Sequence, residues 1–388
     1  MKKIYSVSLT TVKYILFSLL VISYFLQVPF RLLAKFISVF ALLFALANYR
    51  SWLKLFKRPL FCLYCLYISI CIFCVIFNSN IDIGKVVRFS EIFLMLPLFF
   101  CIDESKNSNF YSKVFVRIAF LKAIVLFSIY GIIVKTGSYS AIRAYGHLKG
   151  WGDIYSFGSM FLTRVQVQGN ALLVMAFFTA CYKKDKLFYR VALFLACIIA
   201  GNKAFLIGIF LFVLYFFASW LFKTKRSYNF DFKVCFLLVC TMMSFPVIID
   251  KANSILEEKA GYSNAVRKDQ AEILLSGNII TGNGVGNSIT AKTKYRDYSG
   301  ADYFEVQTLY VINQIGIIGY SLFLILTFGL LLKRKNSFAL VFIYFTYLAY
   351  TFFNPYCFDT THMITGFLLC SVFYSHSKKD VMPNRNLD

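Results

Sequence analysis

Long apolar runs alternate with short polar connections along most of the chain. The runs fall near residues 12–28, 32–48, 60–77, 86–102, 114–134, 158–180, 187–200, 204–222, 234–249, 305–332, 338–353 and 361–375. Most approach the roughly 20 residues that an α-helix needs to cross a bilayer, and they lack the alternation of barrel strands. Backbone polar groups at membrane depth must bond within their own element. The pattern therefore predicts an all-α, polytopic membrane bundle of about twelve transmembrane helices.

The runs form one predicted transmembrane domain over residues 1–388, with two longer connections at 135–157 and 251–304. Within the larger connection, "YSNAVRKDQAEILLSG" has a capping residue, Ser263, apolar residues at helical spacing and a stop at Gly277. It predicts a helix that rests on the bundle or the membrane. "TGNGVGNS" lacks the flanking elements of a phosphate-binding glycine motif, so a turn is the better interpretation.

Basic residues orient this predicted bundle. The 388 residues include 41 Lys and Arg against 18 Asp and Glu, a net charge of +23, but the cations gather in short clusters between apolar runs rather than in a nucleic-acid-binding patch. These clusters lie in every second connection between the apolar runs. Those connections and both termini are therefore predicted to be cytoplasmic. The clusters are Arg50, Lys54, Lys57, Arg58; Lys106, Lys113; Lys183, Lys184, Lys186, Arg190; Lys223, Lys225, Arg226, Lys233; and Lys333, Arg334, Lys335.

Cysteine usage does not indicate metal binding. Eleven cysteines include two C-x-x-C pairs in "CLYCLYISICIFC", but the pairs point in different directions on one apolar helix. A lipid-facing helix surface explains them better than zinc, and no cluster of carboxylates resembles a metal motif. No metal and no cofactor are expected.

Ionisable groups near membrane depth are costly and tend to mark paths for substrates or ions. Arg164 stands in "MFLTRVQVQGNALL", where amides make part of a predicted span polar; a substrate path and an amide-bonded helix interface both fit. Lys203 follows Asn202 at the predicted outer start of a helix, in a tight hairpin or a broken helix. A cation at a helix N-terminus suits an anion, although an ordinary interfacial lysine is the alternative.

Glu305 begins "EVQTLYVINQIGIIG" at the seam between the larger outer connection and an apolar run. On a regular helix Thr308, Ile312, Gly316 and Gly319 share its face. An outer carboxylate with nearby cations suits a reaction that takes a proton from a hydroxyl while a diphosphate departs. An acidic residue at a helix start is also common without any catalytic role. Further possible participants are Arg143, His147, Asn202 and His362, and both histidines are predicted outside the membrane as competing bases.

Four segments resemble the O-antigen polymerase family, integral membrane glycosyltransferases that share architecture with the O-antigen ligases. They are "GNKAFL", "NAVRKDQAEILLSGNIITGNGVGN", "EVQTLYVINQIGIIG" and "NPYCFDTTHMITG". The resemblance implies a GT-C-like enzyme of the bacterial inner membrane, active at the periplasmic face in lipopolysaccharide biosynthesis. Its expected substrates are undecaprenyl diphosphate-linked oligosaccharides, and a chain-length regulator protein is a further expected partner.

The same resemblance suggests roles for particular residues. Arg267 matches a loop arginine expected to hold the donor diphosphate, and Arg164 is a plausible third cation. Lys203 stands where relatives often have an arginine, so it supplies charge without a bidentate fork. Glu305, eleven residues before Gly316, occupies the place of a histidine in the ligases. The expected role of Glu305 is therefore base or acceptor-orienting residue of a polymerase.

Two other functions remain open at this point. A ligase would use the same donor with a different acceptor. A lipid-linked oligosaccharide flippase would have two similar halves, a charged central cavity and short outer connections. The long outer connection and the lack of a visible internal repeat argue against a flippase.

Overall fold

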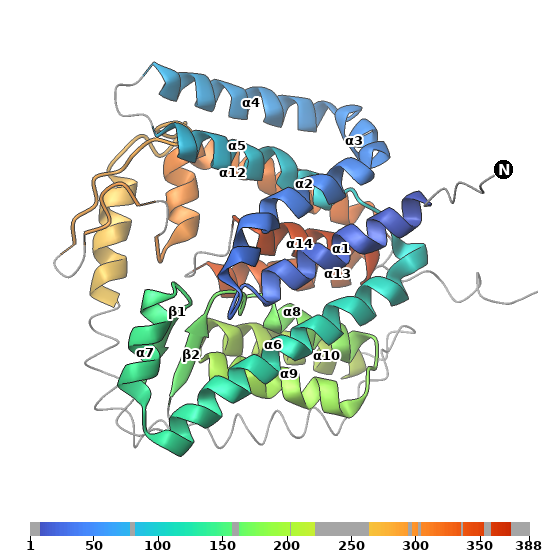
Figure 1. Ribbon diagram of the computed structural model, residues 1–388. Helices are drawn as coiled ribbons and strands as arrows, with labels where there is room; N and C mark the ends of the chain where they lie inside the picture. Colours follow the sequence, from blue (N-terminus) through green and yellow to red (C-terminus); the bar gives the residue numbers. More distant parts are fainter. Residues whose placement is uncertain are drawn as a thin grey trace, which may run out of the picture.

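The structure is a computed structural model, and it describes residues 8–77, 82–156, 163–201, 203–221, 264–293, 297–301, 304–334, 337–352 and 358–373. These residues are mostly helical, as expected from the apolar runs (Figure 1). The elements are α1 (Leu9–Phe25), η1 (Arg31–Phe36), α2 (Ile37–Ala47), α3 (Tyr49–Phe56), α4 (Pro59–Ile76), α5 (Ile83–Phe99), η2 (Ser105–Asn107), α6 (Ser108–Thr136), α7 (Tyr139–Leu148), β1 (Gly152–Tyr155), β2 (Arg164–Val167), α8 (Leu173–Tyr182), α9 (Leu187–Ala200), α10 (Lys203–Leu221), α12 (Gln307–Leu332), α13 (Ser337–Thr351) and α14 (Thr360–Ser371). A further helix over residues 264–275 is called the loop helix below.

Three helical segments among the described residues are long and apolar enough to cross a membrane: α4, the segment from Ser105 to Thr136, and α12. The bent pair formed by Arg31–Ala47 and α3, with an angle of 73° between its parts, adds a fourth if it counts as one span. Shorter apolar helices surround these segments. The figure of twelve crossings stays a prediction, and the expected run at 234–249 lies outside the described residues.

One predicted span is wrong. Residues 158–180 do not form a single helix, because Arg164–Val167 is strand β2, paired antiparallel with β1 in a register that places Gly152 opposite Val167 and Tyr155 opposite Arg164. Helix α8 starts only at Leu173. The signal was present in the sequence, because Val165 and Val167 alternate with the polar residues Arg164 and Gln166. In the structure the two valines are buried and the polar residues less so, which is the period of two of a strand.

Aromatic side chains bind the helices together at the core. Phe17 of α1 packs edge-on against Tyr111 of α6, with ring centroids 4.9 Å apart, and Phe367 of α14 contacts both rings and Phe44 of α2. Each such pair contributes about 0.5–1.5 kcal/mol beyond its buried area. Elsewhere α6 packs on α8 and α9, α10 on α13, and α12 on α4.

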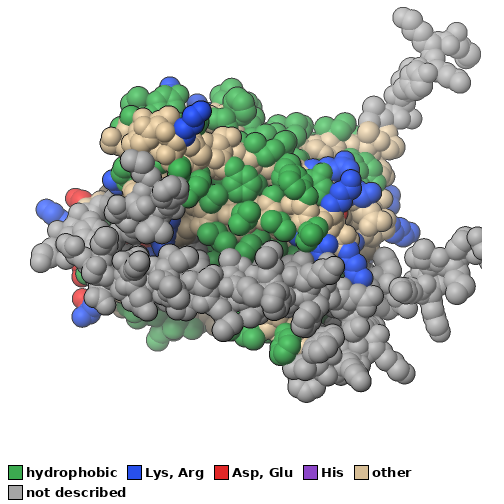
Figure 2. Space-filling view, turned by 90° about the horizontal axis from the view of Figure 1, so that it is seen from below, with side chains coloured by type: hydrophobic (Ala, Val, Ile, Leu, Met, Phe, Trp, Pro, Cys, Tyr) green, Lys and Arg blue, Asp and Glu red, His purple; other side chains and the backbone are tan. Residues whose placement is uncertain are grey.

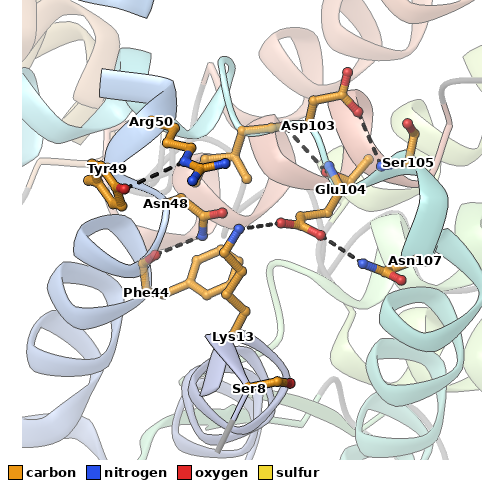
Figure 3. A network of polar contacts seen from close by, with 12 residues as sticks. Ser8, Lys13, Phe44, Asn48, Tyr49, Arg50, Asp103, Glu104, Ser105 and Asn107 are labelled. Atoms are coloured by element: carbon orange, nitrogen blue, oxygen red, sulfur yellow. Dashed lines mark hydrogen bonds and ion pairs between the residues drawn. The ribbon is translucent and has the colours of Figure 1, made fainter. Parts of the chain in front are cut away.

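A polar network closes one end of the bundle (Figure 3). Lys13 Nζ of α1 lies 2.6 Å from Glu104 Oε1, and Asn107 donates to the other carboxylate oxygen at 2.9 Å. The backbone N–H of Glu104 donates to Ser371 near the end of α14, while Arg334, after α12, pairs with Asp103 at 3.0 Å. The start of α1, the α5–α6 connection and the ends of α12 and α14 therefore meet on one side, as the charge pattern predicts for the cytoplasmic side.

The opposite end holds α7, the β1–β2 hairpin, the loop helix and the start of α12, all toward the left of Figure 1. In Figure 2 the described part of the face is largely apolar, and Lys and Arg lie mostly toward its left and right sides. The described parts of both long connections of the prediction therefore lie toward the same side of the molecule.

Candidate functional site

The start of α12 and the loop helix form a charged contact. Arg267 Nε lies 3.0 Å from Glu305 Oε2, and the two side chains retain 36% and 27% of their accessible surface. The backbone N–H of Glu305 donates to Gln270 Oε1 at 2.9 Å. Arg267 and Glu305, 38 positions apart in the sequence, are thus brought together as the sequence analysis expected.

Aromatic packing fixes the position of Glu305. Its neighbours Phe304 and Val306 are buried, and the Phe304 ring stacks on Tyr310, with centroids 4.7 Å apart, and on Tyr298. With the residues on both sides facing the core, the carboxylate of Glu305 is left at the accessible rim of α12. Exposed ion pairs contribute only about 0.2–1 kcal/mol, so a polyanionic ligand can replace Glu305 as the partner of Arg267 at small cost.

The loop helix follows the predicted pattern. Val266 and Leu274 are buried and Ile273 is partly buried, whereas Lys268 and Glu272 form an exposed pair on the other face. The predicted capping residue Ser263 lies outside the described residues. Because the apolar stripe rests on the bundle, Arg267 beside it is held near the protein surface and the range of positions open to its guanidinium is restricted.

Several buried polar atoms around this contact have no hydrogen-bond partner among the described residues. They are Gln270 Nε2, Thr308 Oγ1 and Asn313 Oδ1, in side chains no more than 4% exposed. Buried polar groups are paired in the great majority of cases. Comparable atoms occur elsewhere among the described residues, so here they show only that buried polar side chains continue from the Glu305 contact along the first turns of α12.

The face predicted for α12 is interrupted. Gly316 has φ 69° and ψ 172°, which is not helical, so Gly319 does not continue the face of Glu305 in a straight line. A Cβ on Gly316 would lie 2.3 Å from the backbone oxygen of Ile280 and 2.6 Å from the nitrogen of Gly282. At Gly316 the backbone of α12 is therefore approached closely by residues 280–282 of the larger connection.

Arg164 belongs to strand β2, not to a membrane helix, and lies over the junction of α9 and α10. A Cβ on Gly201 would meet three carbons of the Arg164 side chain at 2.3–2.5 Å. Gly201, with φ 66°, ends α9 in the left-handed conformation, and Lys203 starts α10 two residues later. The Arg164 side chain thus packs on Gly201, two positions before Lys203. Asn202 and the side chain of Lys203 lie outside the described part of the chain.

Arg143 and His147 face one carboxylate from successive turns of α7. Arg143 pairs with Asp153 through Nε and NH2 at 2.9 and 3.2 Å, and His147 Nε2 lies 3.0 Å from Asp153 Oδ1. Burial opposes ionisation of Asp153, but hydrogen bonds from Arg143 and Tyr155 and the charge of Arg143 outweigh it and hold the pKa of this carboxyl below its usual value. The cluster fixes α7 on the β-hairpin, and His147 stays accessible at the outer end.

His362 is not at the outer surface as predicted. It is 0% exposed within α14, its Nε2 lies 3.1 Å from the Tyr344 hydroxyl, and its ring packs against Phe100, Phe323, Tyr347 and Phe358. The helix starts at Thr360, within one residue of the predicted run, and His362 lies in its first turn, where surrounding aromatic side chains enclose it. An enclosed aromatic cage does not suit a base that must reach a substrate hydroxyl.

Two charged residues of the outer end were missed. Lys85, buried in the first turn of α5, donates to the carbonyls of Gly300 and Ala301, shortly before Glu305. Asp359 caps α14 by accepting the N–H of Thr361 at 2.7 Å; burial raises the pKa of its carboxyl to about 7, against the lowering effect of Thr361 and of the charge on Arg88. The acidic residue in "CFDTTH" and its spacing as a helix cap were the available sequence signal for Asp359. Lys85 had no such signal, because nothing in the local sequence marks its contact with residues 300 and 301.

Among the described residues no three His, Cys, Asp or Glu side chains are grouped as metal ligands are. Comparisons with protein-family models, curated proteins and solved structures found no match to this chain. The likeness to O-antigen polymerases therefore rests on the sequence motifs and stays a prediction.

Proposed function

We propose that the protein is a polymerase of lipid-linked oligosaccharide repeat units, a glycosyltransferase that acts at the outer face of a bacterial inner membrane. The observation that carries the proposal is the Arg267–Glu305 contact at the rim of α12, at the end of the molecule opposite to the polar network of Lys13 and Glu104. A cation and a carboxylate held side by side, both accessible, supply the two functions that transfer from a diphosphate to a hydroxyl requires.

In the proposed reaction the acceptor is a sugar hydroxyl of one undecaprenyl diphosphate-linked unit. Its oxygen attacks the anomeric carbon of the chain carried by a second lipid, a new carbon–oxygen bond forms, and the bond to the diphosphate breaks. Glu305 takes the hydroxyl proton, and Arg267 stabilises the negative charge that develops on the departing diphosphate. Arg164, over Gly201, and Lys203, at the start of α10, are candidates to share that charge.

The decisive experiment is a gel of surface lipopolysaccharide from cells that lack the gene and are complemented with variants. We expect a single-repeat band in the deletion strain, a ladder with the native gene, and loss of the ladder with Glu305→Gln. Glu272→Gln on the exposed face of the loop helix is the matched control, because its pair with Lys268 lies in solvent. Membrane abundance of each variant is measured in parallel.

The gel also separates the alternatives. Lipid A core without any repeat would indicate a ligase or a flippase, and the side of the membrane on which lipid-linked units accumulate would distinguish those two. A full ladder with Glu305→Gln at normal abundance would overturn the proposed site.

A further inference from the structure

The break in α12 removes backbone hydrogen bonds that a continuous helix would make around Gly316. Residues 279–284 of the outer connection replace them. The N–H groups of Ile317 and Ile318 donate to the carbonyls of Ile279 and Ile280 at 2.8 and 3.2 Å. In the opposite direction Asn283 and Gly284 donate to Asn313 and Gln314 at 2.7 and 3.0 Å. In an apolar segment such complete pairing is required, because unpaired backbone groups there are costly.

Three left-handed glycines shape the inserted segment. A Cβ on Gly282 would meet the Gln314 oxygen and the Gly316 nitrogen at 2.5 Å, one on Gly284 would meet Val75 of α4, and one on Gly286 would meet Val86 of α5. The side chain of Gln314 fixes the end of the segment by accepting the N–H of Gly286 at 2.7 Å. The segment is thus enclosed by α4, α5 and α12.

Tyr67 of α4 joins the two halves of this contact. Its hydroxyl oxygen lies 2.9 Å from the carbonyl oxygen of Thr281 in the inserted segment and 3.0 Å from that of Ile315 in α12. One hydroxyl hydrogen is shared between these two acceptors. The Tyr67 ring also packs against Gly319, where a Cβ would lie 2.7 Å from its edge.

A continuous set of contacts leads from Tyr67 to the charged pair. Asn313 Nδ2 donates to the Leu274 carbonyl at 2.8 Å, Gln270 accepts the N–H of Glu305, and Arg267 pairs with the Glu305 carboxylate. The loop helix is therefore fastened to the first half of α12 at both of its ends. Glu305 and Ile315 are ten positions apart, a separation of about 15 Å along a helix, so Tyr67 does not touch the reacting atoms.

We propose that Tyr67 is a positioning residue of the transfer reaction: it holds residues 279–284 in the break of α12 and thereby keeps Arg267 and Glu305 in register. The inference rests on the proposed function. Without the hydroxyl, the Thr281 and Ile315 carbonyls lose a shared donor and the inserted segment separates from α12 more often. Bound donor then meets an aligned carboxylate in a smaller fraction of complexes, which lowers kcat more than it raises KM.

The variant that tests this is Tyr67→Phe, with Tyr64→Phe as the matched control. Tyr64 lies one helical turn earlier, and its hydroxyl donates to the Phe93 carbonyl of α5 at 3.1 Å, away from the break. Amide hydrogen exchange of the purified full chain measures how firmly residues 279–284 are held in the break of α12, and it needs no enzymatic activity. We expect residues 279–286 and 313–318 to exchange roughly five- to tenfold faster in Tyr67→Phe and at the native rate in Tyr64→Phe.

Turnover of lipid-linked repeat units per folded molecule supplies the second measurement. The expected result is about a fivefold fall in kcat for Tyr67→Phe with KM for the donor changed less than twofold, and native kcat for Tyr64→Phe. Unchanged hydrogen exchange in Tyr67→Phe overturns the claim that the Tyr67 hydroxyl holds residues 279–284 in the break of α12. Faster exchange with native kcat, in a preparation in which Glu305→Gln is inactive, overturns the positioning role and leaves the proposed function standing. Native activity of Glu305→Gln itself overturns the proposed site and the inference that depends on it.

Discussion

Arg267 has a side chain that is partly exposed, with its Nε atom held in the ion pair with Glu305. Because a diphosphate is matched by a planar fork of donors, Arg267→Ala is expected to lower kcat/KM for the donor by about 10- to 100-fold. Arg267→Lys keeps the charge but loses the fork, so an intermediate loss is expected. Steady-state assays with limiting donor measure both.

Lys268 provides the control for this series, because it neighbours Arg267 and points toward solvent in a 3.9 Å pair with Glu272. Lys268→Ala should keep native kinetics. Equal losses in the Arg267 and Lys268 variants would show that general surface charge, not a specific diphosphate contact, controls donor use.

Asp153 gives the outer end a pH dependence. Its pKa is lower in the folded protein than its ordinary value of 3.8, so ionised Asp153 stabilises the fold above that value and the contribution is lost as pH falls through the lower, folded pKa. Asp153→Asn should lower the unfolding midpoint at pH 6, and the difference from the native protein should shrink below about pH 4. Thermal unfolding in detergent across this range measures it. A difference that grows toward low pH would contradict the assigned ion pair.

At the scale of the element, a comparison of two glycines separates the effect of backbone strain from the effect of close packing. Gly282 and Gly300 both have positive φ, but a Cβ on Gly282 meets the α12 backbone, whereas one on Gly300 meets nothing within 4 Å. Gly300→Ala should therefore cost only the strain of the conformation, about 1 kcal/mol. Gly282→Ala should cost clearly more and should also reduce turnover, because the segment cannot stay in the break of α12. Unfolding midpoints and turnover of the two variants form the comparison, and equal effects would show that close packing at Gly282 is unimportant.

The same scale shows which elements the sequence could predict. The loop helix was readable from Val266, Ile273, Leu274 and the stop at Gly277, because helical periodicity is a local property. The position of Glu305 at the head of α12 was readable for the same reason. The break at Gly316 could not be predicted, because glycine is common in membrane helices. The interruption is possible only because a segment more than 30 positions earlier in the sequence supplies the missing backbone hydrogen bonds.

Two errors share one physical origin. The β-hairpin was hidden because the apolar residues around Arg164 were counted toward a span, although Val165 and Val167 alternate with polar neighbours. His362 was placed outside because it lies at the very start of the predicted run, 361–375. Both depend on where the chain leaves the apolar layer, which hydropathy locates only to within several residues.

At the scale of the whole molecule, the arrangement of charge predicts the orientation on which the proposed function depends. The polar network of Lys13, Asp103, Glu104 and Arg334 lies at one end, and the Arg267–Glu305 contact at the other. Loops rich in Lys and Arg tend to remain in the cytoplasm, so the end with Arg334 is expected there and the proposed site is expected at the periplasmic face.

Fusion reporters test this orientation directly. Alkaline phosphatase, active only in the periplasm, should be active when fused after Gly150, which follows α7, and inactive after Arg334. Green fluorescent protein, which folds in the cytoplasm, should give the reverse result. The paired fusions control for expression, because each position carries both reporters. The opposite pattern would put Arg267 and Glu305 on the cytoplasmic side, where a polymerase acting on exported lipid-linked units has no access to its substrate, and a cytoplasmic reaction would have to replace it.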